Sequence, residues 1–481
     1  MADNAPDNWL HTLEQFVLPT WQSALGAAVA LLVGAILLHR RRRQSNILAW
    51  MFFIFAFPLA GTAAFLVFGL RKHQKTVALK RRINCIAGIM TREDDDGSAG
   101  IADSAVTGPV RPLLGNSVTL LDDDAGTATW RALRDEIAAA RESIHITTYM
   151  LGRDDVGRAL VEQLAARARE GVAVRLLVDA LGSLSAKWGF CRPLVAAGGQ
   201  VRRFMPLLPF QWRGPTNLRN HRKIALFDGR RAIIGGQNLA ERYIGPTPHA
   251  GRFRDFSALV SGPAVAELTR VFLSDWCFAG GEHPERYEKQ LRFNPEPTGG
   301  VRMAIVSGGP DEPGDPLWEQ FLTLIQECRK ELVIVTPYLV PDEVIFRLLL
   351  AKLRAGRRVR LIMPAHSDHP FLDLARRPYL RTLHRAGATV LLYNRGMLHG
   401  KMFLVDGGVG VIGSANLDMR SLFVNFEVAG FIYSPNTIRR LRLLANDIAG
   451  GCIPYGESHL APRHLRNRFL EAVAHLAGPL L

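Results

Sequence analysis

Cysteine is scarce in this chain. The five cysteines stand far apart in the 481 residues, at positions 85, 191, 277, 328 and 452. An odd number of scattered thiols excludes a disulfide framework, and the absence of close pairs excludes a cysteine zinc site. We therefore expect reduced thiols and a main body of the protein that faces the cytoplasm.

Acidic residues are outnumbered. There are 44 Asp and Glu residues against 59 Lys and Arg, which gives a net charge of +15. This balance indicates an anionic partner: nucleic acid, an anionic membrane or a phosphate substrate. The alternative is that the net charge reflects a generally basic proteome and indicates no particular partner. The length allows two or three domains and a large core.

The chain also lacks the basic start of a secretory signal. Residues 1–14 are polar and acidic, which argues against a cleaved signal peptide. Long apolar runs are present instead, at about 16–38 and 47–70, inside a predicted membrane segment 1–82. Each run is long enough to span a bilayer, which takes about 20 residues, so we predict two transmembrane helices.

Membrane orientation stays open, because basic residues follow both runs. Residues 39–43 read HRRRR, and 71–73 read RKH. The positive-inside rule therefore gives conflicting answers. A tight hairpin with both basic ends at one interface would resolve the conflict.

One octapeptide pattern occurs twice. Residues 221–228 read HRKIALFD and residues 399–406 read HGKMFLVD, so both follow H-x-K-x4-D. In each copy an Asn, Asn238 or Asn416, stands seventeen residues after the His. A single copy is as easily a chance strand with a hydrogen-bonded histidine, but two copies with the same downstream Asn make chance a poor explanation.

Strand geometry predicts how these side chains point. Alternate residues of a strand share a face, so each His projects together with its Lys. Asp-Gly ends each motif and is a strong turn signal. We expect both Asp residues to hold the turn and to pair with a basic residue, without transferring protons.

The two sets suit phosphoryl chemistry. Lysine and amide groups neutralise phosphate oxygens while one imidazole attacks phosphorus. A second imidazole gives and takes protons, because its ordinary pKa lies near neutrality. Two such sets face to face supply a nucleophile, an acid–base and a charge clamp without a metal or other cofactor.

The rest of the chain predicts a duplicated α/β unit. Helical spacing at 130–141 and 157–169 alternates with apolar strands at 144–151 and 172–178. The order repeats as strand 332–338, helix 344–354 and strand 359–363. Such alternation favours parallel βαβ units. The predicted organisation is a linker at 83–115, a first lobe at 116–294 and a second lobe at 295–481, with a Pro/Gly-rich boundary at 293–300.

These motifs resemble the phospholipase D superfamily, and within it the bacterial cardiolipin synthases. The resemblance rests on LRNHRK at 218–223, GGQN at 235–238, SGGPD at 307–311, PYLVP at 337–341, HSD at 366–368, GSANLDMRS at 413–421 and NFE at 425–427. It implies an α/β fold of two duplicated sandwich lobes with the active site between them, preceded by the two membrane helices.

The resemblance also implies roles for individual residues. The catalytic set is His221, Lys223, Asp228, His399, Lys401 and Asp406. Phosphate-binding or orienting residues are Asn238, Asn416, Ser414, Glu427 and Asp255. Glu427 is expected to orient His399, and Asp255 to be its first-lobe equivalent. A surface carboxylate paired to Arg254 is the alternative for Asp255, because Phe253 replaces the family's Trp. Tyr149 and Tyr338 end corresponding strands, where pocket lining and core packing are both open.

The activity implied by the resemblance joins two phosphatidylglycerol molecules into cardiolipin and releases glycerol. His221 is the nucleophile by the family's usual assignment, and His399 the acid–base. Partners would be phosphatidylglycerol and anionic membrane lipids, without nucleic acid, at a bacterial inner membrane that the chain crosses more than once. The second lipid and the oligomeric state stay undetermined. Rival interpretations are a phospholipase D-type hydrolase, another phosphatidyltransferase of the same superfamily, a phosphodiester nuclease and a non-catalytic membrane scaffold.

Overall fold

A computed structural model describes residues 44–57, 74–88 and 112–476, with gaps at 124, 187–188, 206–216, 250 and 457–464, and isolated residues between 24 and 65. The chain divides into two compact units. One unit comprises 1–71 with 208–217, and the other comprises 72–207 with 218–481.

The first unit contains helix α2 (Gln44–Ala56). Ile54 and Phe65 are buried in it, and the Trp50 ring lies edge-on to Phe65 at 5.3 Å between centroids. The predicted span 16–38 falls almost entirely outside the described residues, and so does much of 47–70 beyond α2. No helix among the described residues is both long enough and apolar enough to cross a bilayer. The two transmembrane helices therefore stay a prediction.

The second unit, in its described part, begins with α4 (Gln74–Ile86) and contains every strand among the described residues. Its elements up to residue 294, the first half, are β1 (Leu113–Leu121), α6 (Thr127–Ala139), β2 (Ser143–Thr148), α7 (Asp155–Arg169), β3 (Ala173–Asp179), α8 (Arg192–Ala196), β4 (Gln200–Phe204), β5 (Ile224–Phe227), β6 (Arg231–Gly235), β7 (Ser257–Ser261), α9 (Ala264–Gly280), η1 (Pro284–Tyr287) and α10 (Glu288–Arg292).

The second half, from residue 295, repeats much of this order. Its elements are β8 (Val301–Gly308), α11 (Pro316–Glu327), β9 (Glu331–Val335), β10 (Leu339–Val340), α12 (Glu343–Arg354), β11 (Arg358–Pro364), α13 (Pro370–Arg385), β12 (Thr389–Tyr393), β13 (Met402–Val405), β14 (Val409–Gly413), β15 (Leu417–Asp418), α14 (Met419–Phe423), β16 (Glu427–Ile432), α15 (Pro435–Gly450), β17 (Cys452–Pro454) and α17 (Leu465–Leu476).

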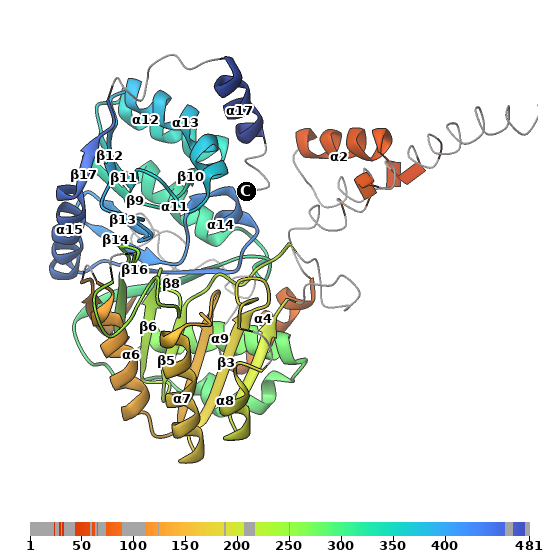
Figure 1. The fold of residues 1–481 in the computed structure, drawn as a ribbon, viewed down its shortest axis with the longest axis vertical. Coiled ribbons are helices and arrows are strands. Elements are labelled where there is room, and N and C mark those ends of the chain that lie inside the picture. The colour runs from red at the N-terminus through yellow and green to blue at the C-terminus, as the bar shows by residue number, and fades with distance from the viewer. Residues whose placement is uncertain are drawn as a thin grey trace, which may run out of the picture. The chain divides into compact units, whose positions relative to one another are not determined.

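One mixed sheet runs through both halves (Figure 1). Its strand order is β17-β12-β11-β9-β13-β14-β16-β8-β1-β7-β6-β5-β2-β3-β4. Reading outward from the central β1–β8 pair, the two halves give the same order of equivalent strands, and β17 is an addition at one edge. Parallel pairing is confined to β2-β3-β4 and β9-β11-β12 among the strands of this sheet. The predicted α/β duplication is thus present, and an antiparallel pair joins its two copies.

Strand alternation divides the apolar residues between the two faces of the sheet. In β5, Ile224 and Leu226 join the core that contains α9, whereas Ala225 and Phe227 join the core under α6 and α7. This is the period of two that a strand buried on both faces requires. Complete burial of a side chain as large as Trp276, on α9, contributes about 2–3 kcal/mol.

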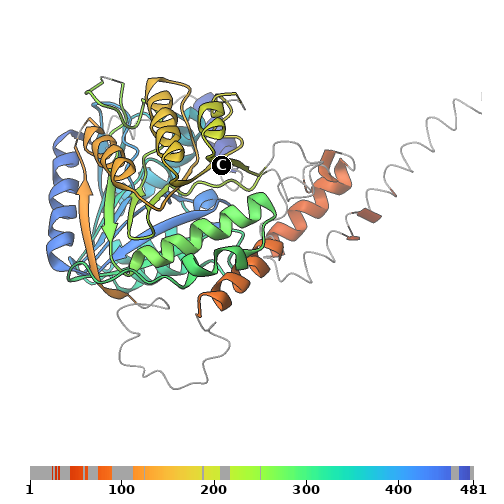
Figure 2. The same ribbon diagram turned by 90° about the horizontal axis from the view of Figure 1, so that it is seen from below.

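Helix α9 also carries α4 on its outer side, and Figure 2 shows the two helices lying alongside each other. Because α4 extends to Ile86, residues 83–86 of the predicted linker are helical. Strand β1 already starts at Leu113, three residues before the predicted lobe. Residues 89–111 lie outside the described structure.

Candidate active site

Both His–Lys pairs lie just before a strand. His221 and Lys223 precede β5, and His399 and Lys401 precede β13, so each predicted strand starts one residue after the lysine. The side chains still project together as predicted. Lys223 Nζ donates to the His221 carbonyl at 2.7 Å, and Lys401 Nζ donates to the His399 carbonyl.

Main-chain pairing between the halves brings the two motifs together. The segment around Asn220 pairs in parallel with Phe426, and Arg254 pairs with Leu398. The His221 N–H donates to the Phe426 carbonyl at 2.9 Å, and the His399 N–H donates to the Arg254 carbonyl at 2.8 Å. Each motif therefore lies beside the carboxylate-bearing segment of the other half.

The orienting carboxylates are consequently exchanged between the halves. His221 Nδ1 lies 2.9 Å from Glu427 Oε1, and His399 Nδ1 lies 2.6 Å from Asp255 Oδ2. The expectation that Glu427 orients His399 is wrong, because main-chain pairing places it against His221. Asp255 is buried and bonded to His399, which also excludes the alternative of a surface carboxylate paired to Arg254.

These bonds determine which ring nitrogen is reactive. A carboxylate only accepts hydrogen bonds, so we assign the proton of each neutral imidazole to Nδ1. Nε2 then keeps its lone pair. Lys401 Nζ lies 2.9 Å from His399 Nδ1 and 3.1 Å from Nε2, so the ammonium lies over the imidazole ring and not along the Nε2 lone pair.

Burial keeps both imidazoles neutral in the empty site. It lowers the pKa of His221 to about 4, against the opposing effect of Glu427, and Lys223 lowers it further. For His399, burial and then Lys401 lower the pKa to about 4, against Asp255. The carboxylates were expected to favour the imidazolium, but the cost of burying a charge is larger here.

The two lysines are also perturbed. Burial lowers the pKa of Lys223 to about 7, opposed first by Glu427. Burial lowers the pKa of Lys401 to about 8, opposed first by Asp255. Lys401 also lowers the pKa of His221 and of Lys223, so the groups of both halves lie within electrostatic range of one another.

Of the two roles predicted for Ser414, phosphate binding or orienting, its contacts fit the orienting one. Its hydroxyl donates to Glu427 Oε2 at 2.5 Å and accepts from the Val428 N–H at 3.0 Å, and the residue is fully buried. Ser414 therefore fixes the carboxylate that holds His221, and its hydroxyl has no free position toward a phosphate.

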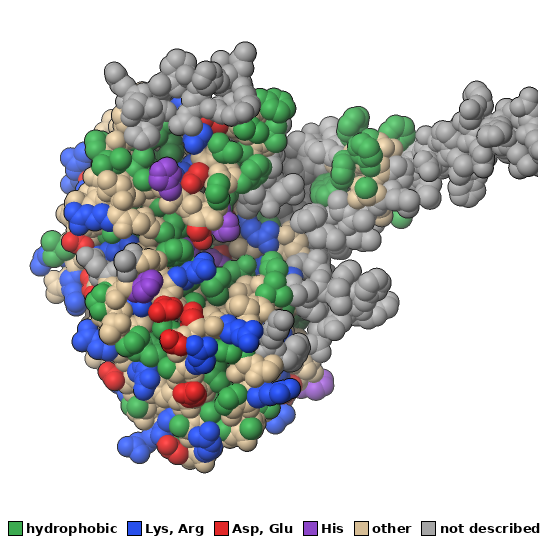
Figure 3. All heavy atoms as spheres, in the orientation of Figure 1, with side chains coloured by type: hydrophobic (Ala, Val, Ile, Leu, Met, Phe, Trp, Pro, Cys, Tyr) green, Lys and Arg blue, Asp and Glu red, His purple; other side chains and the backbone are tan. Residues whose placement is uncertain are grey.

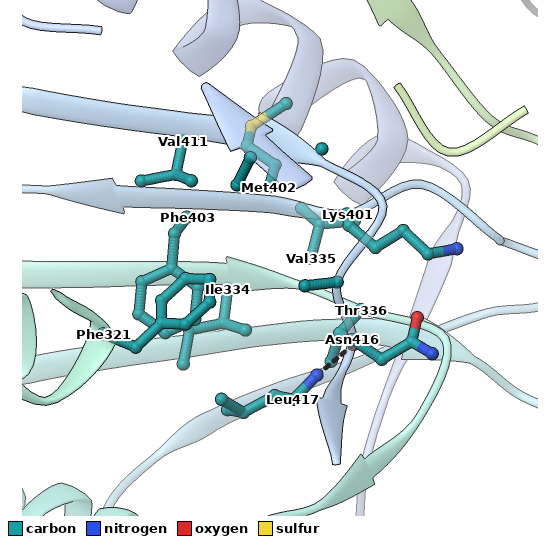
Figure 4. Close-up of a pocket in the computed structure, with 13 residues that line it drawn as sticks. Phe321, Ile334, Val335, Thr336, Lys401, Met402, Phe403, Val411, Asn416 and Leu417 are labelled. Carbon is teal, nitrogen blue, oxygen red and sulfur yellow. Dashed lines mark hydrogen bonds between the residues drawn. The ribbon is translucent and has the colours of Figure 1, made fainter. Parts of the chain in front are cut away.

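The two asparagines lie near the lysines but are not equivalent. Asn238 accepts from the Met150 N–H at 3.2 Å and donates to the Tyr243 hydroxyl. Asn416 donates to Asp418, and its Oδ1 is buried without a hydrogen-bond donor in the described part of the chain. In Figure 4 the side chains of Lys401 and Asn416 extend to the same side, away from the apolar part of the pocket.

Asp228 and Asp406 lie at the opposite ends of β5 and β13 from the His–Lys pairs. Asp228 accepts main-chain N–H bonds from residues 141–143, and Asp406 accepts them from residues 329–331. Both residues adopt positive φ, +54° and +53°, as the predicted turn requires. Main-chain N–H groups thus replace the basic partner expected for each Asp.

A tyrosine from the first half contacts each histidine edge-on. The Tyr149 ring lies 5.3 Å from the His221 ring, and the Tyr243 ring lies 5.1 Å from His399, centroid to centroid. Tyr149 therefore lines the site. Its counterpart Tyr338 instead donates to Asp368 at 2.5 Å. No sequence signal singled out Tyr243.

Arg222, inside the first motif, is fully buried in an ion network. It donates to Asp275 Oδ1 at 2.6 Å, to Asp311 Oδ2 at 2.9 Å and to the Glu427 carbonyl at 3.0 Å. Lys80 of α4 reaches Asp311 at 3.3 Å and Ser307 at 2.7 Å. The network joins α4, α9 and both halves directly behind His221. Three residues of this network lie in stretches already identified in the sequence: Arg222 in the first motif, Asp311 in SGGPD and Lys80 in the predicted membrane segment. Nothing in the sequence indicated that they contact one another.

Within the described ranges, no three His, Cys, Asp or Glu side chains converge as metal ligands would. A metal-independent reaction stays a prediction, based on the two lysines. On the face drawn in Figure 3, Lys and Arg side chains are interspersed with Asp and Glu and form no continuous stripe.

Comparisons with known proteins agree with this geometry. The family model described as cardiolipin synthase, PLD-like domain, matches residues 133–276 and 321–446. A cardiolipin synthase of Geobacillus kaustophilus is 31% identical over 95% of this chain and 93% of its own length. The major cardiolipin synthase of Bacillus subtilis is 30% identical, over 94% of this chain and 97% of its own.

A solved structure has the same fold. The phosphatidylserine synthase of Haemophilus influenzae matches with a TM-score of 0.60 and 14% identity, over 79% of this chain and 99% of its own. At this identity the likeness shows the fold alone. The family match covers more than half of the chain, and the curated relatives cover nearly all of it. The chain therefore belongs to the cardiolipin synthase family of phosphatidyltransferases with phospholipase D-like domains.

Proposed function

We propose that this enzyme joins two phosphatidylglycerol molecules into cardiolipin and glycerol through a phosphohistidine. The observation that carries the proposal is the pair of imidazoles, each held at Nδ1 by a carboxylate of the other half and each beside a buried lysine. One imidazole is then available to attack phosphorus and the other to move the proton.

In the first step, His221 Nε2 forms a bond to phosphorus and the bond from phosphorus to the glycerol oxygen breaks. His399 gives its Nε2 proton to that oxygen, so glycerol leaves as a neutral alcohol. Lys223, Lys401 and the amides of Asn238 and Asn416 are proposed to stabilise the charge on the other phosphate oxygens.

In the second step, the terminal hydroxyl of another phosphatidylglycerol attacks phosphorus. Its proton passes to His399 Nε2, the phosphorus–nitrogen bond breaks and His221 is regenerated. Cardiolipin is the product, and both histidines return to their starting protonation states.

The negative charge of the bound substrate is proposed to explain how His399 acquires the proton that it donates in the first step. With both carboxylates ionised and both lysines protonated, the empty site is neutral, and burial keeps the imidazoles uncharged. A bound phosphodiester adds one negative charge in a buried setting. That charge favours the imidazolium, so substrate binding itself is proposed to protonate His399.

The substrates are membrane lipids, so the site must work at a bilayer surface. The apolar runs at 16–38 and 47–70 are proposed to anchor the chain in a bacterial inner membrane, with the catalytic halves on the cytoplasmic side. The two halves, 116–294 and 295–481, are proposed as the lobes of the catalytic body.

The test is product analysis. Purified full-length protein in vesicles of labelled phosphatidylglycerol should give cardiolipin and glycerol by mass. The His221→Ala protein should give neither product, and His283→Ala, at an exposed histidine of the same half, should behave as the wild type. Phosphatidic acid as the main product would instead support a hydrolase, in which water replaces the second lipid.

A further inference from the structure

A second polar cluster lies beside His399 and has no part in the steps above. Tyr338 follows β9 and is buried, and its hydroxyl donates to Asp368 Oδ1 at 2.5 Å. Asp368 lies between β11 and α13, and its side chain is 27% exposed. Its neighbour His369 is 61% exposed, so the cluster opens to solvent.

The cluster adjoins the reaction centre through Thr336, which lines the same pocket as Lys401 and Asn416. Thr336 Oγ1 donates to the Tyr338 carbonyl at 2.9 Å and accepts from the Leu417 N–H at 3.4 Å.

The Tyr243 ring contacts His399, and its hydroxyl accepts from Asn238. Burial raises the pKa of Tyr243, and Asp368 raises it further. Asp368 also opposes the lowering of the Lys401 pKa, which places its carboxylate within electrostatic range of the phosphate clamp.

A carboxylate in this place is unfavourable for phosphate, which it repels. The Asp368 carboxylate is better suited to the hydroxyl groups of the substrate. Tyr338 donates to Oδ1, whereas the His369 Nε2 atom lies 3.9 Å from Oδ2, beyond hydrogen-bond distance. Oδ2 is therefore free to accept hydrogen bonds, and a carboxylate accepts them well from adjacent hydroxyls.

We propose that Asp368, positioned by Tyr338, binds the hydroxyl groups of the glycerol headgroup that attacks the phosphohistidine and so determines which acceptor is used. The inference rests on the proposed function. In a transfer between two phosphatidylglycerols, the leaving and attacking groups are chemically alike, so by microscopic reversibility both occupy this place. Water offers no second hydroxyl to Asp368, and this difference favours transfer over hydrolysis.

The test separates acceptor choice from formation of the phosphoenzyme. A phosphatidyl p-nitrophenol donor has a leaving group without a polyol, and p-nitrophenolate release gives a burst that counts active sites. The phosphohistidine is then offered glycerol, methanol or water, and the products are phosphatidylglycerol, phosphatidylmethanol and phosphatidic acid. In each transfer an alcohol oxygen bonds to phosphorus, the phosphorus–nitrogen bond breaks and the alcohol proton passes to His399.

Asp368→Asn should lower the ratio of glycerol transfer to methanol transfer by at least about tenfold, the loss expected for a charge-assisted hydrogen bond. Tyr338→Phe removes only the hydroxyl and should lower the same ratio by a smaller factor. The control is Glu343→Gln, an exposed carboxylate at the start of α12, which should keep the wild-type ratio.

Two results would overturn the inference. In the first, Asp368→Asn keeps the glycerol-to-methanol ratio of the wild type. In the second, both transfers fall equally, which would mean that Asp368 only supports the local structure. Failure of the proposed function looks different, because then the wild-type protein itself would transfer the phosphatidyl group to neither alcohol.

Discussion

Each reactive imidazole depends on a carboxylate that the other half supplies. Glu427 and Asp255 are buried, and burial would raise the pKa of each. His221, Lys223 and Ser414 together outweigh burial for Glu427, and His399, Lys401 and the Phe256 N–H together do so for Asp255, so the pKa of each carboxyl is lowered. Both therefore stay ionised and hold the Nδ1 proton throughout the reaction.

Amide substitutions should affect different steps of the reaction. Glu427→Gln should slow formation of the phosphohistidine, because His221 loses the charged acceptor at its Nδ1. Asp255→Asn should slow both its formation and its breakdown, because His399 donates a proton in the first step and accepts one in the second. Each step should slow by roughly 10²–10⁴-fold, the usual contribution of a positioned acid–base group. The measurement is acid-quenched protein with substrate labelled at phosphorus, followed by peptide mapping. Label on His399, with the two effects exchanged, would reverse the assigned roles.

The pH dependence of kcat/KM follows from the same groups. Below about pH 4, His221 is protonated and cannot attack. As the pH rises through about 7, Lys223 loses its charge and phosphate binding weakens. His399 also has a pKa lowered to about 4 and must take up a proton before the first step, so we expect kcat/KM to decline between these values and to fall more steeply above about pH 7.

Lys223→Arg provides the check on this profile, because arginine stays charged. The alkaline limb should move up toward about 8, the pKa of Lys401. Thermal unfolding of the variant establishes that it has folded. An alkaline limb that does not move would mean that another group controls it.

The residue types of the site followed from the sequence, but the contacts did not. Two H-x-K-x4-D copies identified both His–Lys pairs, because their spacing is local. The exchange of Glu427 and Asp255 depends on main-chain pairing between segments roughly 140 to 210 residues apart. The role of Ser414 stayed open between phosphate binding and orienting for a similar reason: the sequence cannot tell a hydroxyl that faces a carboxylate from one that faces a substrate.

Four elements meet at Arg222. Its guanidinium bridges Asp275 on α9 and Asp311 after β8, and Lys80 of α4 contacts the same Asp311. A buried ion network of this kind adds little net stability, but the loss of one partner leaves a charge uncompensated. Because Arg222 lies between His221 and Lys223, the network also fixes the first motif.

Asp311→Asn should therefore lower the free energy of unfolding by about 3–5 kcal/mol. The control is Asp155→Asn, whose ion pair with Arg158 is exposed and should matter by less than about 1 kcal/mol. Urea unfolding of the two proteins, followed by circular dichroism, gives the comparison. Equal midpoints would show that the network is not important for stability.

Element positions were largely predictable from periodicity and glycine stops. The predicted helices 157–169 and 344–354 correspond to α7 and α12, and Gly171 and Gly356 follow them with positive φ. The early start of β1 was not predicted, because its pairing with β7 and β8 decides it. Local sequence carries no signal for such partners.

The continuous sheet places the active site where the two halves meet. Pairing of β1 with β8 and the bridges at 220–426 and 254–398 all connect the halves. The duplication could be read from the sequence, but its closure into one sheet could not, since edge strands give no indication of their partners. Neither half holds a complete site, because each histidine requires the other half's carboxylate.

Two truncations separate membrane attachment from folding. Removing residues 1–71 leaves α4 and Lys80 in place, so the unfolding midpoint should stay close to that of the full chain. Removing residues 1–88 also deletes Lys80, which leaves Asp311 with less compensating charge and should lower the midpoint. Both shortened proteins should lose most of their attachment to phosphatidylglycerol vesicles in sedimentation after a salt wash, because both lack the apolar runs. Full retention of either protein on the vesicles would mean that the catalytic halves themselves hold the membrane, and that the anchor assigned to 16–38 and 47–70 is wrong or incomplete.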